Sequence, residues 1–130
     1  MTIPVAFHAE LDRNVTTRTE KNLFMRDVIT NIGGGYNGQT GMFTAPVSGT
    51  YCFMATASPG QGNISRAEIV SNSTVVAYLW SEDDASCTCH TTVKLLEGQK
   101  VSLRSYGKEE YQFHGPGNTS FSGMLLQPDL

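Results

Sequence analysis

Two short segments of this chain are apolar on both faces of the strand that each would form. In residues 51–55 and 121–126, one face has Tyr51, Phe53, Ala55, Phe121 and Leu125, and the other has Cys52, Met54, Met124 and Leu126. Successive side chains of a strand point to opposite faces, and a sandwich domain on its own buries only one of them. The sequence predicts no helix layer that would cover the second face. We therefore predict a symmetric oligomer whose copies cover it. The predicted interface residues are Cys52, Met54, Met124 and Leu126.

The length and composition of the chain indicate a single domain over residues 1–130. The sequence is 39% hydrophobic, and its composition does not shift along the chain. A chain of this size buries a sufficient core without a metal ion or disulfide bonds.

The distribution of charge argues against nucleic acids and membranes as partners. The net charge is -3, and the nine Lys and Arg residues are scattered along the chain rather than gathered in one stretch. Nucleic-acid-binding domains instead concentrate basic residues on one face. The sequence also lacks the roughly 18 consecutive apolar residues of a membrane-spanning helix. We therefore expect neither nucleic-acid binding nor membrane insertion. The residues from Met1 to Pro4 lack the apolar core of a signal peptide.

The asparagines favour an extracellular location. Four of the seven lie in Asn-x-Ser/Thr sequences, the acceptor pattern for N-glycosylation. These candidate glycosylation sites are Asn14, Asn63, Asn72 and Asn118. The alternative is that Asn, Ser and Thr gather in turns for conformational reasons.

Alternating apolar residues and recurring turn signals predict an all-β sandwich or barrel. The expected strands are residues 5–9, 41–45, 49–57, 66–70, 74–80, 87–95, 100–106 and 120–126. Residues 23–29 fit either a short helix or an irregular strand, because their apolar spacing suits both.

Motifs for nucleotide binding and hydrolysis are absent. Gly33 and Gly38 have the spacing of a phosphate-binding loop, but Gln39 stands where that loop needs a lysine. We expect a hairpin with an Asn-Gly turn there instead. The chain has no Gly-x-Ser-x-Gly and no His-Glu-x-x-His sequence, so we predict that it is not an enzyme.

The three cysteines admit three interpretations. Cys87 and Cys89 are two residues apart on an expected strand, so both point to the core, whereas Cys52 shares the outward face with Met54. We expect mostly unpaired, buried thiols. One disulfide bond would need a bulge or a different register, and a zinc site with His90 would have atypical spacing.

Three consecutive carboxylates, Glu82, Asp83 and Asp84, form a candidate metal site. Oxygen ligands suit a hard cation such as calcium when copies of the chain bring further carboxylates near. The alternative is a solvated acidic loop.

A second candidate site follows the expected strand 100–106. Cationic and aromatic side chains there bracket a loop that contains Gly and Pro, and such a mixture suits sugars or acidic groups. The candidate ligand-binding residues are Arg104, Tyr106, Lys108, Tyr111 and His114. An ordinary polar loop would have the same composition.

Several segments in this order and spacing resemble the globular domain of the complement C1q family. They are Val5–Ala9, Asn31–Gly33 with Tyr36, Thr40–Phe53, Gly98 with Val101 and Leu103, and Ser120–Leu126. The resemblance covers nearly the whole chain and is closest to the stand-alone members, which lack a collagen stalk. It implies a ten-stranded jelly roll like that of the tumour necrosis factor (TNF) family, assembled as a homotrimer. It also implies a secreted recognition module.

The resemblance leaves two functions open. The first is a lectin-like module of innate immunity that binds glycans or acidic ligands on pathogens. The second is a TNF-like signalling ligand that binds a cell-surface receptor. Calcium is a candidate ion, although the loop from Trp80 to Cys87 is shorter than in calcium-binding relatives.

Overall fold

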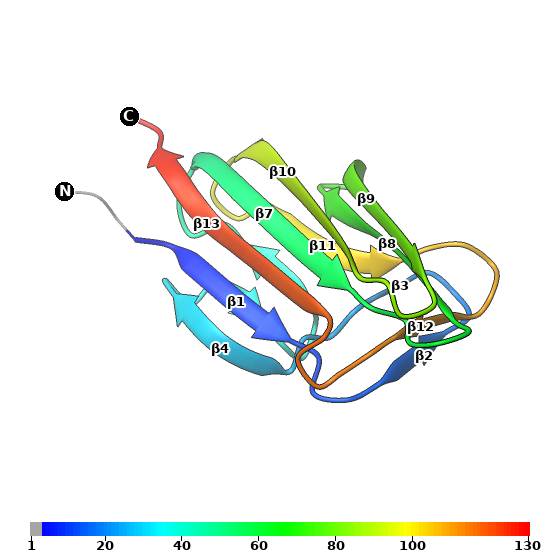
Figure 1. Cartoon of the computed structure of the whole chain (residues 1–130). Coiled ribbons are helices and arrows are strands. Elements are labelled where there is room, and N and C mark those ends of the chain that lie inside the picture. Colours follow the sequence, from blue (N-terminus) through cyan, green and yellow to red (C-terminus); the bar gives the residue numbers. More distant parts are fainter. Residues whose placement is uncertain (1–3) are drawn as a thin grey trace.

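The chain forms a sandwich of two antiparallel sheets (Figure 1). The computed structural model describes residues 4–130, and the first three residues of the single domain expected over 1–130 lie outside the described residues. Within residues 4–130 there are thirteen strands and no helix, so no helix in this part of the chain is long and apolar enough to cross a membrane.

Sheet I contains the two segments that are apolar on both faces. Its strands, in spatial order, are β10 (Cys87–Leu95), β7 (Gly49–Ala57), β13 (Ser120–Pro128), β1 (Ala6–Glu10) and β4 (Asp27–Ile32). All four pairings are antiparallel, and β1 begins where β13 ends, at one end of the sandwich (Figure 1).

Sheet II forms the second layer. Its strands, in spatial order, are β5 (Tyr36–Asn37), β6 (Met42–Thr44), β11 (Lys100–Ser105), β8 (Ile64–Ser71) and β9 (Thr74–Glu82). The short β3 (Lys21–Asn22) also pairs with β11, and β2 (Val15–Thr17) pairs with β12 (Tyr111–Phe113) in a separate ribbon. The two principal sheets have five and six strands, and the all-β jelly-roll fold class is confirmed.

Aromatic rings fill the space between the sheets. The Phe7 ring stacks on Tyr36 with centroids 4.8 Å apart and on Phe43 at 5.0 Å, while Phe121 meets Phe7 edge-on at 5.2 Å. Gly123 allows this packing, because a Cβ atom there would lie 2.6 Å from the ring atoms of both Phe7 and Phe53. Burial also raises the pKa of Tyr36 to about 12.

The two-faced pattern of sheet I is confirmed. Tyr51 and Phe53 of β7 are fully buried, whereas Met54 is 48% exposed in the single chain. On β13, Phe121 is buried, but Met124 and Leu126 are 51% and 55% exposed. Sheet I therefore has an inner face in the core and an apolar outer face.

The observed strand boundaries agree best with the expected ones where apolar and polar residues alternate regularly. β7 and β10 have the expected bounds, whereas β2, β3, β5 and β12 were not expected. Residues 23–29 form no helix: Leu23 and Met25 are buried in an irregular segment, and β4 begins at Asp27. Long-range packing sets these short strands, so local periodicity did not reveal them.

The glycine-rich segment forms the expected hairpin, but its loop is longer than an Asn-Gly turn. β5 and β6 pair across a loop of residues 38–41, in which the amides of Thr40 and Gly41 donate to the Asn37 carbonyl. The Asn37 side chain accepts a further bond from the Gln39 amide at 2.9 Å. Gly41, the last residue of the loop, has a positive φ of 73°, a conformation that glycine adopts readily.

The cysteines lie as the alternation predicted. Cys87 and Cys89 pair with Ala57 and Ala55 and face the core, while Cys52 faces outward, and all three are free thiols. Burial raises the pKa of the Cys89 thiol to about 11, and the nearby Cys87 adds to the increase. Among residues 4–130, no three or more His, Cys, Asp and Glu side chains are grouped so that they could hold a metal ion.

Candidate functional site

The outer face of sheet I is built from two rows of residues that run across the strands. The first row is apolar except at one end, and consists of Thr92, Cys52, Met124, Ala6 and Ile32. The second row is more polar, and consists of His90, Met54, Ser122, His8 and Thr30. A shallow hollow of about 280 Å³ lies between them and is lined by Cys52, Met54, Met124 and parts of β1.

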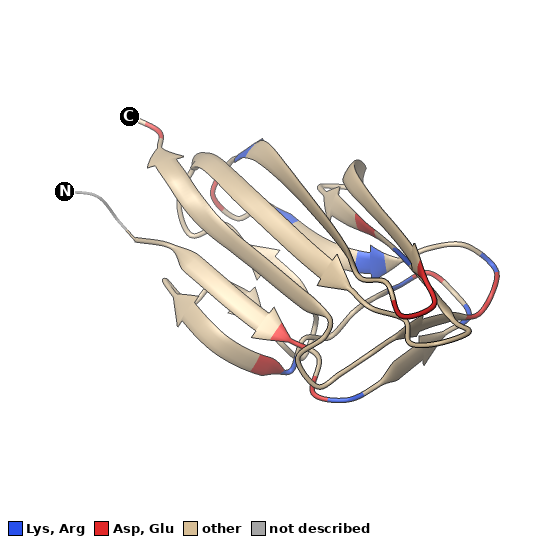
Figure 2. Cartoon of the chain, in the orientation of Figure 1, with Lys and Arg blue, Asp and Glu red and all other residues tan. Residues whose placement is uncertain are grey.

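Few charges interrupt this outer face. β7 and β13 contain no Lys, Arg, Asp or Glu, and the charged residues of sheet I lie near strand ends, as Glu10, Asp27 and Lys94 (Figure 2). On β1, His8 Nδ1 lies 2.5 Å from Ser122 Oγ and its Nε2 lies 3.0 Å from Glu10 Oε2. Three of the four predicted interface residues, Cys52, Met54 and Met124, thus share one largely uncharged surface, and the fourth, Leu126, is exposed at the irregularity near the end of β13.

The acidic loop does not assemble a cation site within one chain. Glu82, Asp83 and Asp84 are all exposed. Asp83 Oδ1 accepts a hydrogen bond from the Gly62 amide at 3.0 Å, and the Asp83 amide donates to the Asn63 carbonyl at 2.9 Å. Asp83 has a left-handed φ of 56°, and the hydrogen bond from the Gly62 amide ties its carboxylate to the neighbouring turn. Any calcium site would need carboxylates from other copies.

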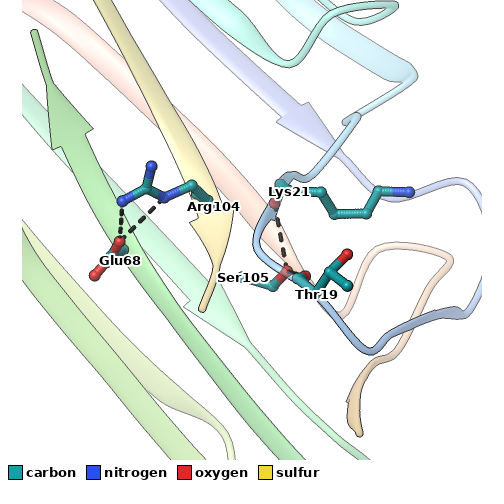
Figure 3. Close-up of polar contacts among 5 residues, drawn as sticks. All are labelled: Thr19, Lys21, Glu68, Arg104 and Ser105. Atoms are coloured by element: carbon teal, nitrogen blue, oxygen red, sulfur yellow. Dashed lines mark hydrogen bonds and ion pairs between the residues drawn. The ribbon is translucent and has the colours of Figure 1, made fainter. Parts of the chain in front are cut away.

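Arg104, the first candidate ligand-binding residue, already has a partner. On the outer face of sheet II, its guanidinium donates from Nε and Nη2 to Glu68 Oε1, the first bond measuring 3.0 Å (Figure 3). The Glu68 side chain is only 6% exposed, so this is a shielded ion pair. Ser105 points to the opposite side and donates to the Thr19 carbonyl at 3.1 Å (Figure 3).

Tyr106 and Tyr111 meet at Arg66, a residue that the sequence pattern did not single out. The Arg66 guanidinium lies 4.3 Å from the centre of the Tyr106 ring, and its Nη1 donates to the Tyr111 hydroxyl at 3.4 Å. The phenolic groups of Tyr106 and then Tyr111 raise the pKa of Arg66. Tyr111 is otherwise buried, so its hydroxyl is the part that contributes to this surface.

Lys108 and His114 lie apart from this contact. Lys108 is exposed in the loop of residues 107–110, after β11. His114 follows β12, and its amide donates to the Ser58 carbonyl at 2.7 Å. The structure therefore brings Tyr106 and Tyr111 together and gives Arg104, Lys108 and His114 separate surroundings.

The aromatic residues of β9 complete the surface around Arg66. Tyr78 and Trp80 point outward from sheet II and are 61% and 54% exposed, while Leu79 between them is buried. Tyr78 pairs with Glu68 and Trp80 pairs with Arg66 across the β8–β9 hairpin. The period-two alternation of β8 and β9 predicts which residues point outward. The register between the two strands decides which of those residues lie side by side.

The candidate glycosylation sites differ in exposure. Asn14, Asn72 and Asn118 are exposed, whereas Asn63 is half-buried. The Ser65 of its acceptor sequence is fully buried and donates to the Gln112 carbonyl. Asn14 and Asn72 side chains accept bonds from the Gly115 and Lys100 amides, at 3.0 Å and 3.2 Å.

Comparison with known proteins gives matches along nearly the whole chain. The family model described as C1q domain matches residues 6–126. One subunit of the human complement C1q subcomponent is 31% identical over 134 residues, which cover 97% of this chain and 51% of the relative. This chain therefore spans about half the length of that curated relative.

Solved structures share the same jelly roll. The globular domain of zebrafish complement 1qA protein has a TM-score of 0.74 and 18% identity, covering 97% of this chain and 99% of that one. Murine APRIL has a TM-score of 0.74 and 10% identity, covering 95% and 99%. The Eiger TNF of S. frugiperda has a TM-score of 0.72 and 9% identity, covering 99% and 96%. At such identities the likeness establishes the fold.

Proposed function

Because the chain belongs to the C1q domain family, we propose that it is a secreted, trimeric recognition module of innate immunity that binds glycans or acidic ligands without catalysis. Two kinds of surface support the proposal. One is the uncharged outer face of sheet I, and the other is the aromatic and cationic outer face of sheet II. The matched human relative is by its name a complement subunit, which supports the immune assignment.

The outer face of sheet I supports the trimer, and this is the observation that carries the proposal. Met54, Met124 and Leu126 are about half exposed on strands that contain no charged residue. Burying side chains of this kind contributes at most roughly 1.5–3 kcal/mol each. Three copies around an axis would cover all these faces at once, because each copy contributes the same surface.

The ligand-binding part of the proposal rests on residue chemistry. Of the candidate residues Arg104, Tyr106, Lys108, Tyr111 and His114, Tyr106 and Tyr111 lie together beside Arg66, whereas Arg104 is already paired with Glu68. Arginine can bind a carboxylate with two parallel hydrogen bonds, and an aromatic ring can pack on the apolar face of a sugar. A shallow site of this kind binds weakly, so three copies on one trimer would strengthen binding to a dense surface through effective concentration.

Two measurements test the proposal. Light scattering on the wild-type protein at micromolar concentration should give about three times the chain mass of 14.1 kDa. A glycan array probed with the fresh trimer should then show binding that rises steeply with ligand density. A monomer in solution contradicts the assembly, and a blank array contradicts glycan recognition.

A TNF-like signalling ligand is the second candidate function. The structural likeness to murine APRIL and to the Eiger TNF is as high as the likeness to the C1q domain, and it favours this alternative equally at the level of the fold. A pull-down of cell-surface proteins with the trimer distinguishes the two functions. Saturable capture of one receptor together with a blank glycan array would favour signalling.

A further inference from the structure

Arg66 is held in place by groups that do not neutralise its charge. Its guanidinium packs on the Tyr106 ring at 4.3 Å and donates one bond to the Tyr111 hydroxyl. Neither partner is a carboxylate. Within the described chain, no carboxylate lies within 4.0 Å of Arg66, whereas the neighbouring Arg104 is paired with Glu68. Arg66 is therefore a positioned cation that forms no ion pair within the described chain.

The surroundings of Arg66 form a hollow of about 380 Å³. Its lining residues are Ile64, Arg66, Trp80, Tyr106, Glu109 and Tyr111. This volume falls within the range of about 300–1,000 Å³ found for small-molecule sites. Trp80, the single tryptophan of the chain, is 54% exposed, and Tyr78 beside it is 61% exposed. Tyrosine, tryptophan and arginine are among the residue types enriched at binding surfaces.

We propose that this hollow binds a sugar residue that carries a carboxylate, such as a sialic or uronic acid. Arg66 would contact the carboxylate, and Trp80 would pack against the apolar face of the sugar ring. The inference rests on the proposed recognition of glycans or acidic ligands, and it names the ligand class and the residues that bind it.

The charges in the hollow restrict the class of acidic ligand further. Glu109 lines the same hollow as Arg66, so the site offers one cation and one anion. A sugar has hydroxyl groups that donate to the Glu109 carboxylate and one carboxylate that accepts from Arg66. Sulfated chains of high negative charge would be repelled by Glu109 and would lack further cations to pair with. Monocarboxylate sugars therefore fit better than polyanions.

Variants on a dense surface test the site. The probes are polymers that display sialyllactose or lactose at equal density. Loss of a charge-assisted contact corresponds to about a tenfold or greater loss of affinity. Arg66→Gln should lower binding to the sialylated polymer by this factor, down to the level of the lactose polymer. The affinity of Arg66→Lys should lie between those of the wild type and Arg66→Gln, because lysine keeps the charge but loses the planar guanidinium group. Trp80→Ala should weaken binding to both polymers.

Arg13→Gln is the matched control, because Arg13 is an exposed arginine outside the hollow, paired with Asp12. It should leave binding unchanged. If the wild type binds the sialylated polymer and the Arg66 and Trp80 variants bind it equally well, this site is wrong while the proposed function stands. If the wild type binds no glycan surface, the proposed function fails and this inference fails with it.

Trp80 fluorescence gives a test without a variant. Because Trp80 is the only tryptophan, its emission reports on the hollow alone. Titration of the wild type with N-acetylneuraminic acid to tens of millimolar should change this emission, and galactose should change it less. An emission that is insensitive to the acid over that range would overturn the proposal.

Discussion

The two outer faces of the sandwich both expose large apolar side chains, but they differ in the residues that surround those side chains. On sheet I, Met54, Met124 and Leu126 lie on strands without a single charged residue (Figure 2). On sheet II, Trp80 lies beside Arg66 of the adjacent strand, and Tyr78 lies beside Glu68, the partner of Arg104. Aliphatic surface without charge is easily covered by protein, because no ion has to be desolvated. Aromatic rings beside arginine suit a polar ligand with an apolar face.

Under the proposed function, this difference separates assembly from recognition. A change on the outer face of sheet I should act on the oligomer, and a change on the outer face of sheet II should act on ligand binding or on the fold of one chain.

The largest expected effect is from Met124→Glu, which would dissociate the trimer. Three symmetry-related carboxylates would be forced into a dry interface, where unpaired charges are costly. Size-exclusion chromatography with light scattering should show a monomer or misfolded protein. Leu96→Glu is the matched control, since Leu96 is 57% exposed but lies in the turn after β10. Equal dissociation by both variants would mean that exposure alone, rather than the outer face of sheet I, decides the outcome.

The second prediction separates the two arginines of sheet II. Arg104→Ala should lower the free energy of unfolding by about 2–3 kcal/mol, because it leaves the shielded Glu68 carboxylate without a partner. Arg66→Ala should lower the free energy of unfolding less than Arg104→Ala does, because it leaves no shielded carboxylate without a partner. Urea denaturation at fixed protein concentration measures both.

A double variant, Arg104→Met with Glu68→Leu, provides the control for the ion pair. It should recover most of the stability that Arg104→Ala loses, since no buried charge remains. A double variant as unstable as Arg104→Ala would show that side-chain packing, rather than the unpaired carboxylate, accounts for the loss.

The third prediction uses the thiols to compare the faces of sheet I. Native trimer should react slowly with a thiol reagent, and denatured, unreduced protein should titrate close to three thiols, because all three cysteines are free. In the Met124→Glu variant, Cys52 should become reactive, whereas Cys87 and Cys89 should stay slow on the inner face. A count near one in denatured protein would reveal a disulfide bond.

The pH dependence of Cys89 follows from its raised pKa. The thiolate is the reactive form, and burial moves this pKa from 9.0 to about 11, so the reaction rate of Cys89 should keep rising with pH between 9 and 11 instead of levelling off near pH 9. The unfolded chain ionises first, so the contribution of this thiol to stability is present below pH 9 and is lost as the pH rises towards 11. A Cys89 rate that levels off near pH 9 would contradict its burial.

The smallest expected effect concerns calcium at the acidic loop. Glu82, Asp83 and Asp84 do not converge within one chain, so millimolar calcium should raise the melting temperature little more than sodium chloride of matched ionic strength. Thermal unfolding in both salts checks this. A clear rise with calcium alone would place carboxylates of several copies around a shared ion.

The faces on which the side chains of sheet I lie could be predicted from the sequence, because they depend on local strand geometry. Strands alternate with a period of two, so Tyr51 and Phe53 must share a face that Cys52 and Met54 do not. The same rule placed Cys87 and Cys89 on the core side. It failed for β2, β3 and β12, which contain two or three residues each and are too short for any period to appear.

The availability of each arginine to a ligand was settled only by the folded chain. Arg104 and Glu68 are 36 residues apart in sequence, and Arg66 and Tyr111 are 45 apart. Both contacts arise from the order of strands and from their register, which the packing of the whole sandwich sets. The family, the fold class and the two faces of each strand could be recognised in the sequence, because they follow from patterns along the chain. That Arg104 is paired and Arg66 is not could not be recognised there, because the partner of a side chain on a sheet comes from the neighbouring strand.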